Sequence, residues 1–344
     1  MNNQKILIVT ECFYPEQFNI NELAHSWQDR GYDVHVLTLF PSYPAGKIFS
    51  GYKNKFFSKE IYKAITIYRV YAVTGYKDNK FKKLLKYINF MTLGSIVAAL
   101  IGRKYDYIFG FNLGALTDMV PAVVIRKLYK KPLMFWVQDV WPDSVYAYGF
   151  KKTKVLSRLL NLFVKFMFNN VTSIAITGKG FENKLRPYVK KNLDFNYVPN
   201  WAIQLNNNIE EISLSDEGKV NFTFAGNIGK VQNLENIIKA FNMLSNEYQG
   251  KAQLNIIGDG SFLEQLMKIS KHGGITSVNN IGSIFDSAGL GLSIAIYYDL
   301  IAVSAVHLAC SLNAVRWPSP ATDLVDTIID NPLIEKDNMI YPND

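Results

Sequence analysis

The chain has 344 residues, of which 49% are hydrophobic and 19% charged. This composition excludes an intrinsically disordered, collagen-like or coiled-coil protein, and the length is sufficient for two domains. Its two cysteines and four histidines leave little material for disulfides or a zinc site, so we expect a reducing compartment and no bound metal.

Charge is distributed unevenly along the chain. Residues 1–200 carry 29 Lys and Arg against 13 Asp and Glu, a balance of +16, whereas residues 201–344 carry 8 against 16, a balance of −8. The first half is therefore expected to face an anionic partner. The start, MNNQKILIVT, does not resemble a secretory signal, and no clean run of ~20 apolar residues indicates a membrane span.

Short apolar, β-branched segments alternate with amphipathic segments through the first 200 residues. The predicted strands are Lys5–Thr10, Asp33–Leu39, Ala64–Val73, Tyr105–Phe109, Pro132–Val137 and Ser173–Thr177. The predicted helices are a segment from Asn19 to about Gly31, Lys80–Ile101, Ala115–Tyr129, Lys151–Asn169 and a segment ending near Pro187. After a polar segment, Gln204–Gly218, the alternation restarts with strand Val220–Ala225, helix Leu234–Leu244, strand Ala252–Ile257 and helix Phe262–Ser270.

This alternation predicts an α/β protein with two Rossmann-like, doubly wound parallel domains in tandem. We expect an N-terminal domain over residues 1–203, a linker over 204–218 and a C-terminal domain over 219–344.

Two glycine-containing turns follow strands of the second domain. The segment VNFTFAGNIGKVQN places Gly226 and Gly229 between a strand and a helix, with Asn227, Lys230 and Gln232 as further donors. Glycines let the backbone approach a phosphate, to which a helix N-terminus offers free N–H groups. The segment LNIIGDG ends a second strand in Gly258, Asp259 and Gly260. The alternatives are plain strand-to-helix turns, with Asp259 as a helix cap.

Polar and aromatic residues follow two strands of the first domain. FWVQDVWPDS places Asp139, Trp141 and Asp143 at a strand exit, where carboxylates can bind sugar hydroxyls or accept a proton. ECFYPEQFNIN places Glu16 and Asn19 after the first strand, at the same sheet edge. Alternatively, Asp143 and Asn19 only begin helices and the tryptophans belong to the core.

Two segments combine basic and apolar side chains. The first contains Lys82, Lys83 and Lys86 ahead of the apolar run Tyr87–Ile101; the second is a helix with Lys151, Lys152, Lys154 and Arg158. This pattern is typical of helices on an anionic bilayer, the alternative being the solvated face of a packed helix. Nucleic acid is disfavoured as a partner because no recognised binding motif is present.

Together, ILIVTECFYPEQFNINELA, FWVQDVWPDS, VPNW, FAGNIGKVQNLENIIKAF and IIGDG resemble bacterial glycosyltransferase family 4 enzymes of the GT-B fold. The likeness is to O-antigen and capsule transferases of the N-acetyl-L-fucosamine type, and it covers about residues 5–282. It implies transfer from a nucleotide sugar to a saccharide on a polyprenyl diphosphate, without a metal or other cofactor. It further implies a cytoplasmic protein, peripheral on the anionic inner membrane surface.

The resemblance also assigns roles to individual residues. Gly226, Asn227, Gly229 and Lys230 would lie at the donor diphosphate. Gly258 and Gly260 would border the nucleotide, and Asp139 would lie in the acceptor cleft as a possible base. Many relatives carry Arg and Lys where this chain has Asn227 and Gln232.

Residues 283–344 depart from the family pattern. No Glu occurs between Glu264 and Glu335, and the expected acidic motif is missing. We expect this tail to be out of frame or degenerated, or else naturally divergent. The alternatives to an active transferase are therefore an inactive homologue that at most binds membranes, and a GT-B sugar-nucleotide epimerase.

Overall fold

The computed structural model describes residues 4–43, 45–76, 80–147, 150–201, 220–226, 228–245, 252–258, 260 and 262–272. These fall into two compact units, which we call the first unit (4–201) and the second unit (220–272). The predicted linker 204–218 and the atypical tail 283–344 lie outside the described residues, as do Asn227 and Asp259.

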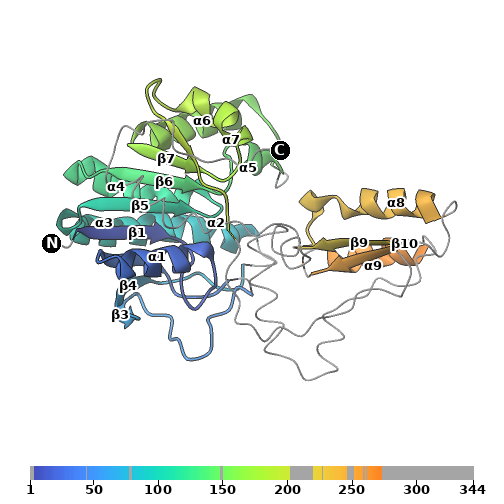
Figure 1. The fold of residues 1–344 in the computed structure, drawn as a ribbon, viewed down its shortest axis with the longest axis horizontal. Coiled ribbons are helices and arrows are strands. Elements are labelled where there is room, and N and C mark those ends of the chain that lie inside the picture. Colours follow the sequence, from blue (N-terminus) through green and yellow to red (C-terminus); the bar gives the residue numbers. More distant parts are fainter. Residues whose placement is uncertain are drawn as a thin grey trace. The chain divides into compact units, whose positions relative to one another are not determined.

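An eight-stranded sheet forms the centre of the first unit (Figure 1), in the order β3-β4-β2-β1-β5-β6-β7-β8. Its strands are β1 Lys5–Thr10, β2 Asp33–Leu39, β3 Phe57–Tyr62, β4 Ile65–Val70, β5 Tyr107–Asn112, β6 Leu133–Val137, β7 Ser173–Ile176 and β8 Phe195–Tyr197. All neighbours pair in parallel except β3 and β4. The doubly wound α/β fold is thus confirmed for this unit.

Helices cover both faces of this sheet. They are α1 Asn19–Asp29, α2 Lys80–Asn89, α3 Ser95–Ile101, α4 Val120–Tyr129, α5 Asp143–Ala147, α6 Lys154–Asn169 and α7 Gly180–Leu185, with a π turn η1 Phe90–Gly94 and 3-10 turns η2 Gly102–Lys104, η3 Leu116–Met119 and η4 Arg186–Tyr188. On one face Trp27 of α1 packs edge-on against Phe109, with ring centroids 5.0 Å apart. On the other face α3, α4 and α6 share one core with Leu7 and Val9 of β1. Because both faces are covered, the central strands are continuously apolar.

Two strands, β3 and β8, were not predicted, and α5 was expected only in the alternative in which Asp143 begins a helix. Strand β3 pairs antiparallel to β4 as the edge of the sheet, so its side chains alternate between exposed and half-buried. The helix predicted over Lys80–Ile101 is interrupted by the π turn η1. Gly94 at the end of that turn lies against α4, since a Cβ there would be 2.9 Å from Pro121 Cγ.

Within the described residues, one helical stretch, Leu84–Lys104, has the length and mean hydropathy (1.7) of a membrane span. Its buried residues Lys86, Phe90, Gly94, Ala98 and Gly102 are four apart, and Gly102 meets Ile125 of α4 as Gly94 meets Pro121. The stretch therefore packs on the first unit along one line, whose last three members are small.

The second unit is a β-α-β-α segment. It contains the parallel strands β9 Val220–Ala225 and β10 Ala252–Ile257, the helices α8 Leu234–Ser245 and α9 Leu263–His272, and a 3-10 turn η5 Lys230–Gln232. Leu234, Ile238, Leu254, Ile256 and Leu266 form its core. The bounds of both strands are those predicted from the sequence.

Candidate functional site

The first unit has a switch point between β1 and β5. The chain proceeds from β1 to β2 and β4 on one side, then returns across the sheet to β5 on the other side of β1. Open α/β sheets bind ligands outside the carboxyl ends of strands at such a point. The carboxyl end of β1 is followed by Glu11, and that of β5 by the turn η3, which contains Asp118.

A buried group of charged side chains occupies this switch point. The Lys86 ammonium, from α2, forms an ion pair with the Glu11 carboxylate, and both side chains are only 10% exposed. Asp118 is 3% exposed and hydrogen-bonded to Glu11, so one of the two carboxyl groups carries a proton. The Asp118 Oδ2 atom has no hydrogen-bond partner. Three elements far apart in sequence thus meet where a ligand is expected.

Burial and mutual charge set the protonation states of this group. Burial raises the pKa of the Asp118 carboxyl well above its usual value, and the Glu11 carboxylate raises it further. Burial alone lowers the pKa of the Lys86 ammonium, but the Glu11 carboxylate together with Tyr76 and Cys12 outweighs this effect, and the net pKa is raised. The group therefore combines an ion pair between Lys86 and Glu11 with a neighbouring acid, Asp118, whose protonated form is favoured by burial.

Glu16 was predicted to line an acceptor cleft, and this is wrong because its side chain is 2% exposed. Its Oε1 atom accepts backbone hydrogen bonds from Ser42 (2.8 Å) and Tyr43 (2.7 Å). Burial raises the pKa of Glu16 to about 7, although these two N–H donors lower it. Glu16 therefore joins the loops that follow β1 and β2.

Asn19 is likewise buried, at 1% exposure, and does not face a cleft as predicted. Its side-chain amide donates to the Trp201 carbonyl at 2.9 Å, and the Trp201 indole donates to Glu22 of α1 at 2.7 Å. The Trp201 ring also stacks on Trp136 of β6, with centroids 5.2 Å apart. Asn19 thus fixes the end of the first unit against α1.

Asp139 follows β6 at the same carboxyl edge and is half-buried. Burial raises the pKa of its carboxyl group, and the Val140 N–H partly opposes this. The preceding Gln138 accepts a hydrogen bond from the Asn200 side chain at 2.8 Å, while its own amide nitrogen is buried without a partner. A half-buried carboxyl group with a raised pKa is suited to accepting a proton.

Trp141 and Asp143 have structural partners. The Trp141 indole donates to the Gly114 carbonyl at 3.1 Å and packs edge-on against Phe163 of α6. Asp143 begins α5, as the alternative prediction held, and forms an ion pair of 2.9 Å with Lys184. Both side chains of that pair are more than half exposed.

The glycine turns of the second unit lie against each other. A Cβ on Gly258, whose φ is +145°, would be 1.9 Å from the Gly226 carbonyl oxygen. The Phe262 N–H donates to the Ile228 carbonyl at 3.0 Å, which joins the two loops. Only glycine fits at this backbone contact. The predicted residues Gly226, Gly229, Gly258 and Gly260 are therefore gathered at the ends of β9 and β10.

Two other predicted donor residues, Lys230 and Gln232, lie beside these turns. Gly229 precedes η5, and its N–H donates to the Gln232 side-chain oxygen at 3.2 Å. Lys230 is exposed as the first residue of η5. The loop that contains Gly229 and the exposed Lys230 ammonium thus both lie at the carboxyl ends of β9 and β10.

The predicted membrane-contact residues divide into two groups. Lys82, Lys151, Lys152, Lys154 and Arg158 are exposed. For Lys86 the prediction is wrong, because its ammonium is directed into the protein and paired with Glu11. Lys83 lies on α2, and its side chain is outside the described part of the structure.

Glu11, Lys86 and Asp118 are the residues that sequence reasoning missed as a site. Four other lysines lie close to Lys86 in the sequence, and nothing in the local sequence indicates that Lys86 is the buried member of this group. A Glu directly after a buried strand was the available signal for Glu11. In the described residues, no group of three or more His, Cys, Asp or Glu side chains could hold a metal ion.

No protein-family model matches the chain. It is 28% identical over 175 residues to the probable glycosyltransferase WbjE of Pseudomonas aeruginosa, a match that covers 48% of this chain and 42% of WbjE. It is 23% identical over 295 residues to the putative colanic acid biosynthesis glycosyl transferase WcaI of Escherichia coli K12, covering 80% of this chain and 70% of WcaI. The chain thus spans less than half of the first relative.

Two solved structures share the fold. An E. coli trehalose-6-phosphate structure bound with UDP-2-fluoro glucose matches with a TM-score of 0.54 at 10% identity, over 78% of this chain and 70% of that chain. The catalytic domain of starch synthase IV from Arabidopsis thaliana, bound to ADP and acarbose, matches with a TM-score of 0.50 at 10% identity, over 80% and 73%. The GT-B-like α/β fold and the resemblance to bacterial glycosyltransferases are both confirmed.

Proposed function

We propose that this chain is a glycosyltransferase of surface polysaccharide assembly, of the O-antigen or capsule type. It moves a sugar from a nucleotide-sugar donor to a saccharide carried on a polyprenyl diphosphate. The names of WbjE and WcaI support transfer over the epimerase and the non-catalytic alternatives. The observation that carries the proposal is the pair of glycine turns joined at the ends of β9 and β10.

The donor diphosphate is assigned to the second unit. The turn Gly226–Gly229 lets the backbone approach the phosphates, and the exposed Lys230 adds a positive charge. These groups stabilise the negative charge that develops on the leaving nucleoside diphosphate. The nucleotides in the two structural neighbours support this class of donor.

The acceptor is assigned to the carboxyl edge of the first unit. The acceptor hydroxyl oxygen forms a bond to the anomeric carbon, the bond from that carbon to the diphosphate oxygen breaks, and the hydroxyl proton passes to Asp139. The unpartnered Asp118 Oδ2 and Gln138 amide nitrogen offer an acceptor and a donor for saccharide hydroxyls. We place the protein on the anionic inner face of the plasma membrane because a polyprenyl-linked acceptor resides there.

Substitution of Gly229 tests the donor assignment. The Gly229 backbone is extended (φ −110°, ψ 164°), so Gly229→Leu adds a side chain without backbone strain. We expect calorimetric titration with a panel of nucleotide sugars to show binding to the parent chain and at least about tenfold weaker binding to the variant. Gly180→Leu, at an exposed position with open space around it, is the control. Failure of every nucleotide sugar to bind the parent chain would refute the proposal.

A further inference from the structure

Helix α6 exposes two parallel rows of side chains. A polar row is formed by Lys154, Arg158, Asn161 and Lys165, and an apolar row by Val155, Leu159, Leu162 and Phe166. Within each row the spacings are four, three and four residues, which places its members on one line of the helix. The two rows are one residue apart and therefore adjacent. The inward side of α6 is separate, formed by the buried Val164, Met167 and Phe168.

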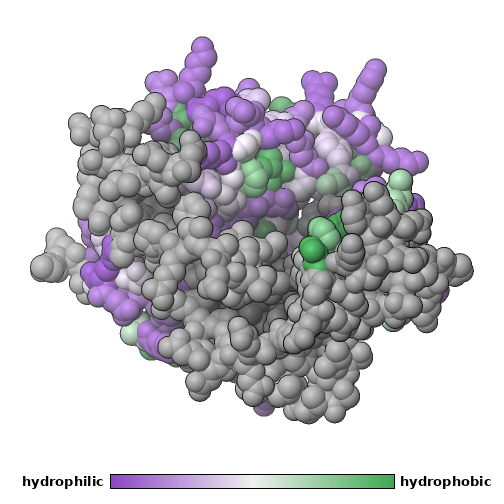
Figure 2. Space-filling model, turned by 45° about the vertical axis from the view of Figure 1, so that its right-hand side comes forward, coloured by the Kyte–Doolittle hydropathy of each residue, from purple (hydrophilic) through white to green (hydrophobic). Residues whose placement is uncertain are grey.

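The apolar row has no cover in the first unit. Val155 is 71% exposed, Leu159 60% and Leu162 58%. Neighbouring α4 continues this surface, because Leu128 is 56% exposed and the Lys127 ammonium lies 6.0 Å from the centre of the Phe166 ring. Figure 2 shows hydrophilic side chains with hydrophobic ones between them along the upper part of the described surface, the height at which α6 lies in Figure 1.

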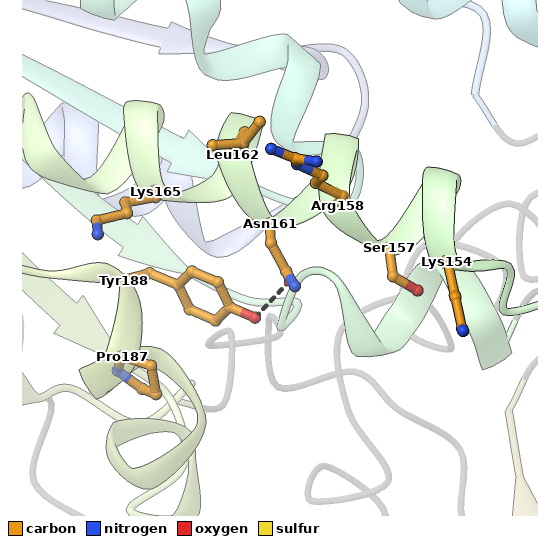
Figure 3. A pocket seen from close by; sticks show the side chains of 8 residues that line it. All are labelled: Lys154, Ser157, Arg158, Asn161, Leu162, Lys165, Pro187 and Tyr188. Carbon is orange, nitrogen blue, oxygen red and sulfur yellow. Dashed lines mark hydrogen bonds between the residues drawn. The ribbon is translucent and has the colours of Figure 1, made fainter.

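The polar row forms one wall of a shallow pocket of about 560 Å³. Lys154, Arg158 and Lys165 contribute three cations, and Pro187 and Tyr188 of η4 form the opposite wall (Figure 3). The Tyr188 hydroxyl donates to Asn161 at 2.8 Å, which holds the two walls together. Among the described residues that line this pocket none is acidic, and the sequence of α6 contains no Asp or Glu. The polar row is therefore a line of positive charge along α6, which favours an extended anionic surface as its partner.

We propose that α6 is the membrane-docking element, lying in the plane of an anionic bilayer with its apolar row in the acyl boundary and its polar row at the phospholipid headgroups. A row of cations beside a row of exposed Leu, Val and Phe complements a bilayer surface, where anionic headgroups lie next to apolar acyl chains. A soluble acidic partner would satisfy the cations but leave the apolar row exposed. The inference deepens the proposed function, since it identifies the surface that brings the enzyme to a lipid-linked acceptor.

Vesicle co-sedimentation of the full chain tests this inference without any sugar. The vesicles are phosphatidylcholine alone, or phosphatidylcholine with one part in three phosphatidylglycerol. We expect binding to the anionic vesicles only. Lys154→Gln, Arg158→Gln and Lys165→Gln combined should weaken the partition coefficient about 100-fold, because each cation near such a surface contributes about a factor of five. Leu159→Ser with Leu162→Ser should weaken it at least about tenfold.

Two controls make the result specific to α6. Lys47→Gln, Lys53→Gln and Lys55→Gln remove the same charge from exposed positions between β2 and β3, and should change the partition less than about threefold. Phe56→Ser with Ile61→Ser removes exposed apolar side chains at the β3 edge of the sheet and should have a similarly small effect.

The proposal is overturned if the parent chain ignores anionic vesicles, if it binds neutral vesicles equally well, or if either control variant loses as much binding as the α6 variants. Nucleotide-sugar binding is measured without vesicles, so failure of the proposed function and failure of this inference are separate outcomes.

Discussion

Replacing Lys86 with methionine tests whether the buried charges at the switch point act as one unit. Methionine retains the length and apolar character of the lysine side chain but removes its ammonium. Glu11 and Asp118 then remain buried without a cation. The Glu11 and Lys86 side chains are each only 10% exposed, so solvent cannot replace the lost partner.

The structure indicates a large cost for this change. Removing one partner of a buried ion pair typically destabilises a protein by about 3–5 kcal/mol, because the remaining charge stays buried. For a unit of this size, 1 kcal/mol shifts the melting temperature by about 2–4 °C, so we expect Lys86→Met to lower it by roughly 10 °C. The double variant Glu11→Gln, Lys86→Met removes both charges and should lie within about 1 kcal/mol of the parent chain.

The effect should depend on pH in a defined direction. Without Lys86, the pKa of the Glu11 carboxyl is raised in the folded state above its unfolded value of about 4.3. The folded variant then binds more protons than the unfolded chain in this range, so its stability falls as pH rises. The deficit relative to the parent should therefore be larger at pH 8 than at pH 5.

Urea denaturation followed by tryptophan fluorescence measures these differences, because four of the five tryptophans lie in the first unit. The reasoning is refuted if Lys86→Met is within 1 kcal/mol of the parent at pH 8. It is equally refuted if the double variant is less stable than Lys86→Met alone.

Three further predictions address single sites. The pKa of Glu16 is about 7 in the folded state, against 4.5 when unfolded, so the folded state holds a proton that the unfolded chain releases. The free energy of unfolding should therefore fall by about 3 kcal/mol between pH 5 and 8. Glu16→Gln should flatten this decline in urea titrations, and an equally steep decline in the variant and the parent would contradict the prediction. Gly258→Ala places a Cβ 1.9 Å from a carbonyl oxygen, at a φ of +145°, and should therefore destabilise the second unit. Limited proteolysis should then cleave this unit much faster than in the control Gly180→Ala, because position 180 has open space around it. Asp139→Asn should lower kcat about 100-fold with little change in donor KM, whereas the exposed control Asp194→Asn should not; an equal loss in both would exclude Asp139 as the base.

The strands of both units were predictable because their local pattern is strong. Lys5–Thr10, Asp33–Leu39, Val220–Ala225 and Ala252–Ile257 have the predicted bounds. A parallel strand buried on both faces is a continuous β-branched run, which differs clearly from the flanking polar turns. The edge strand Phe57–Tyr62 was missed because polar residues occupy its middle (Ser58, Lys59 and Glu60) and it has only one neighbour in the sheet.

The positions of the candidate site residues were predicted better than their roles. Asp139 and the glycines do lie at the carboxyl ends of parallel strands, as the strand–turn–helix pattern implies. Glu16, Asn19 and Lys86 are buried, although polar side chains in loops and basic helices are usually exposed. Burial depends on which loops pack together, and sequence pattern does not contain that information.

The amino-acid sequence by itself determined the alternation of strands and helices, the glycine turns and the resemblance to glycosyltransferases, because each depends on residues within a few positions of one another. Only the tertiary structure decided that Glu11, Lys86 and Asp118 meet at a switch point and that the apolar row of α6 remains uncovered. Strand order brings β1 beside β5 across about a hundred residues of chain. Contacts over such separations arise from the packing of whole elements on a sheet.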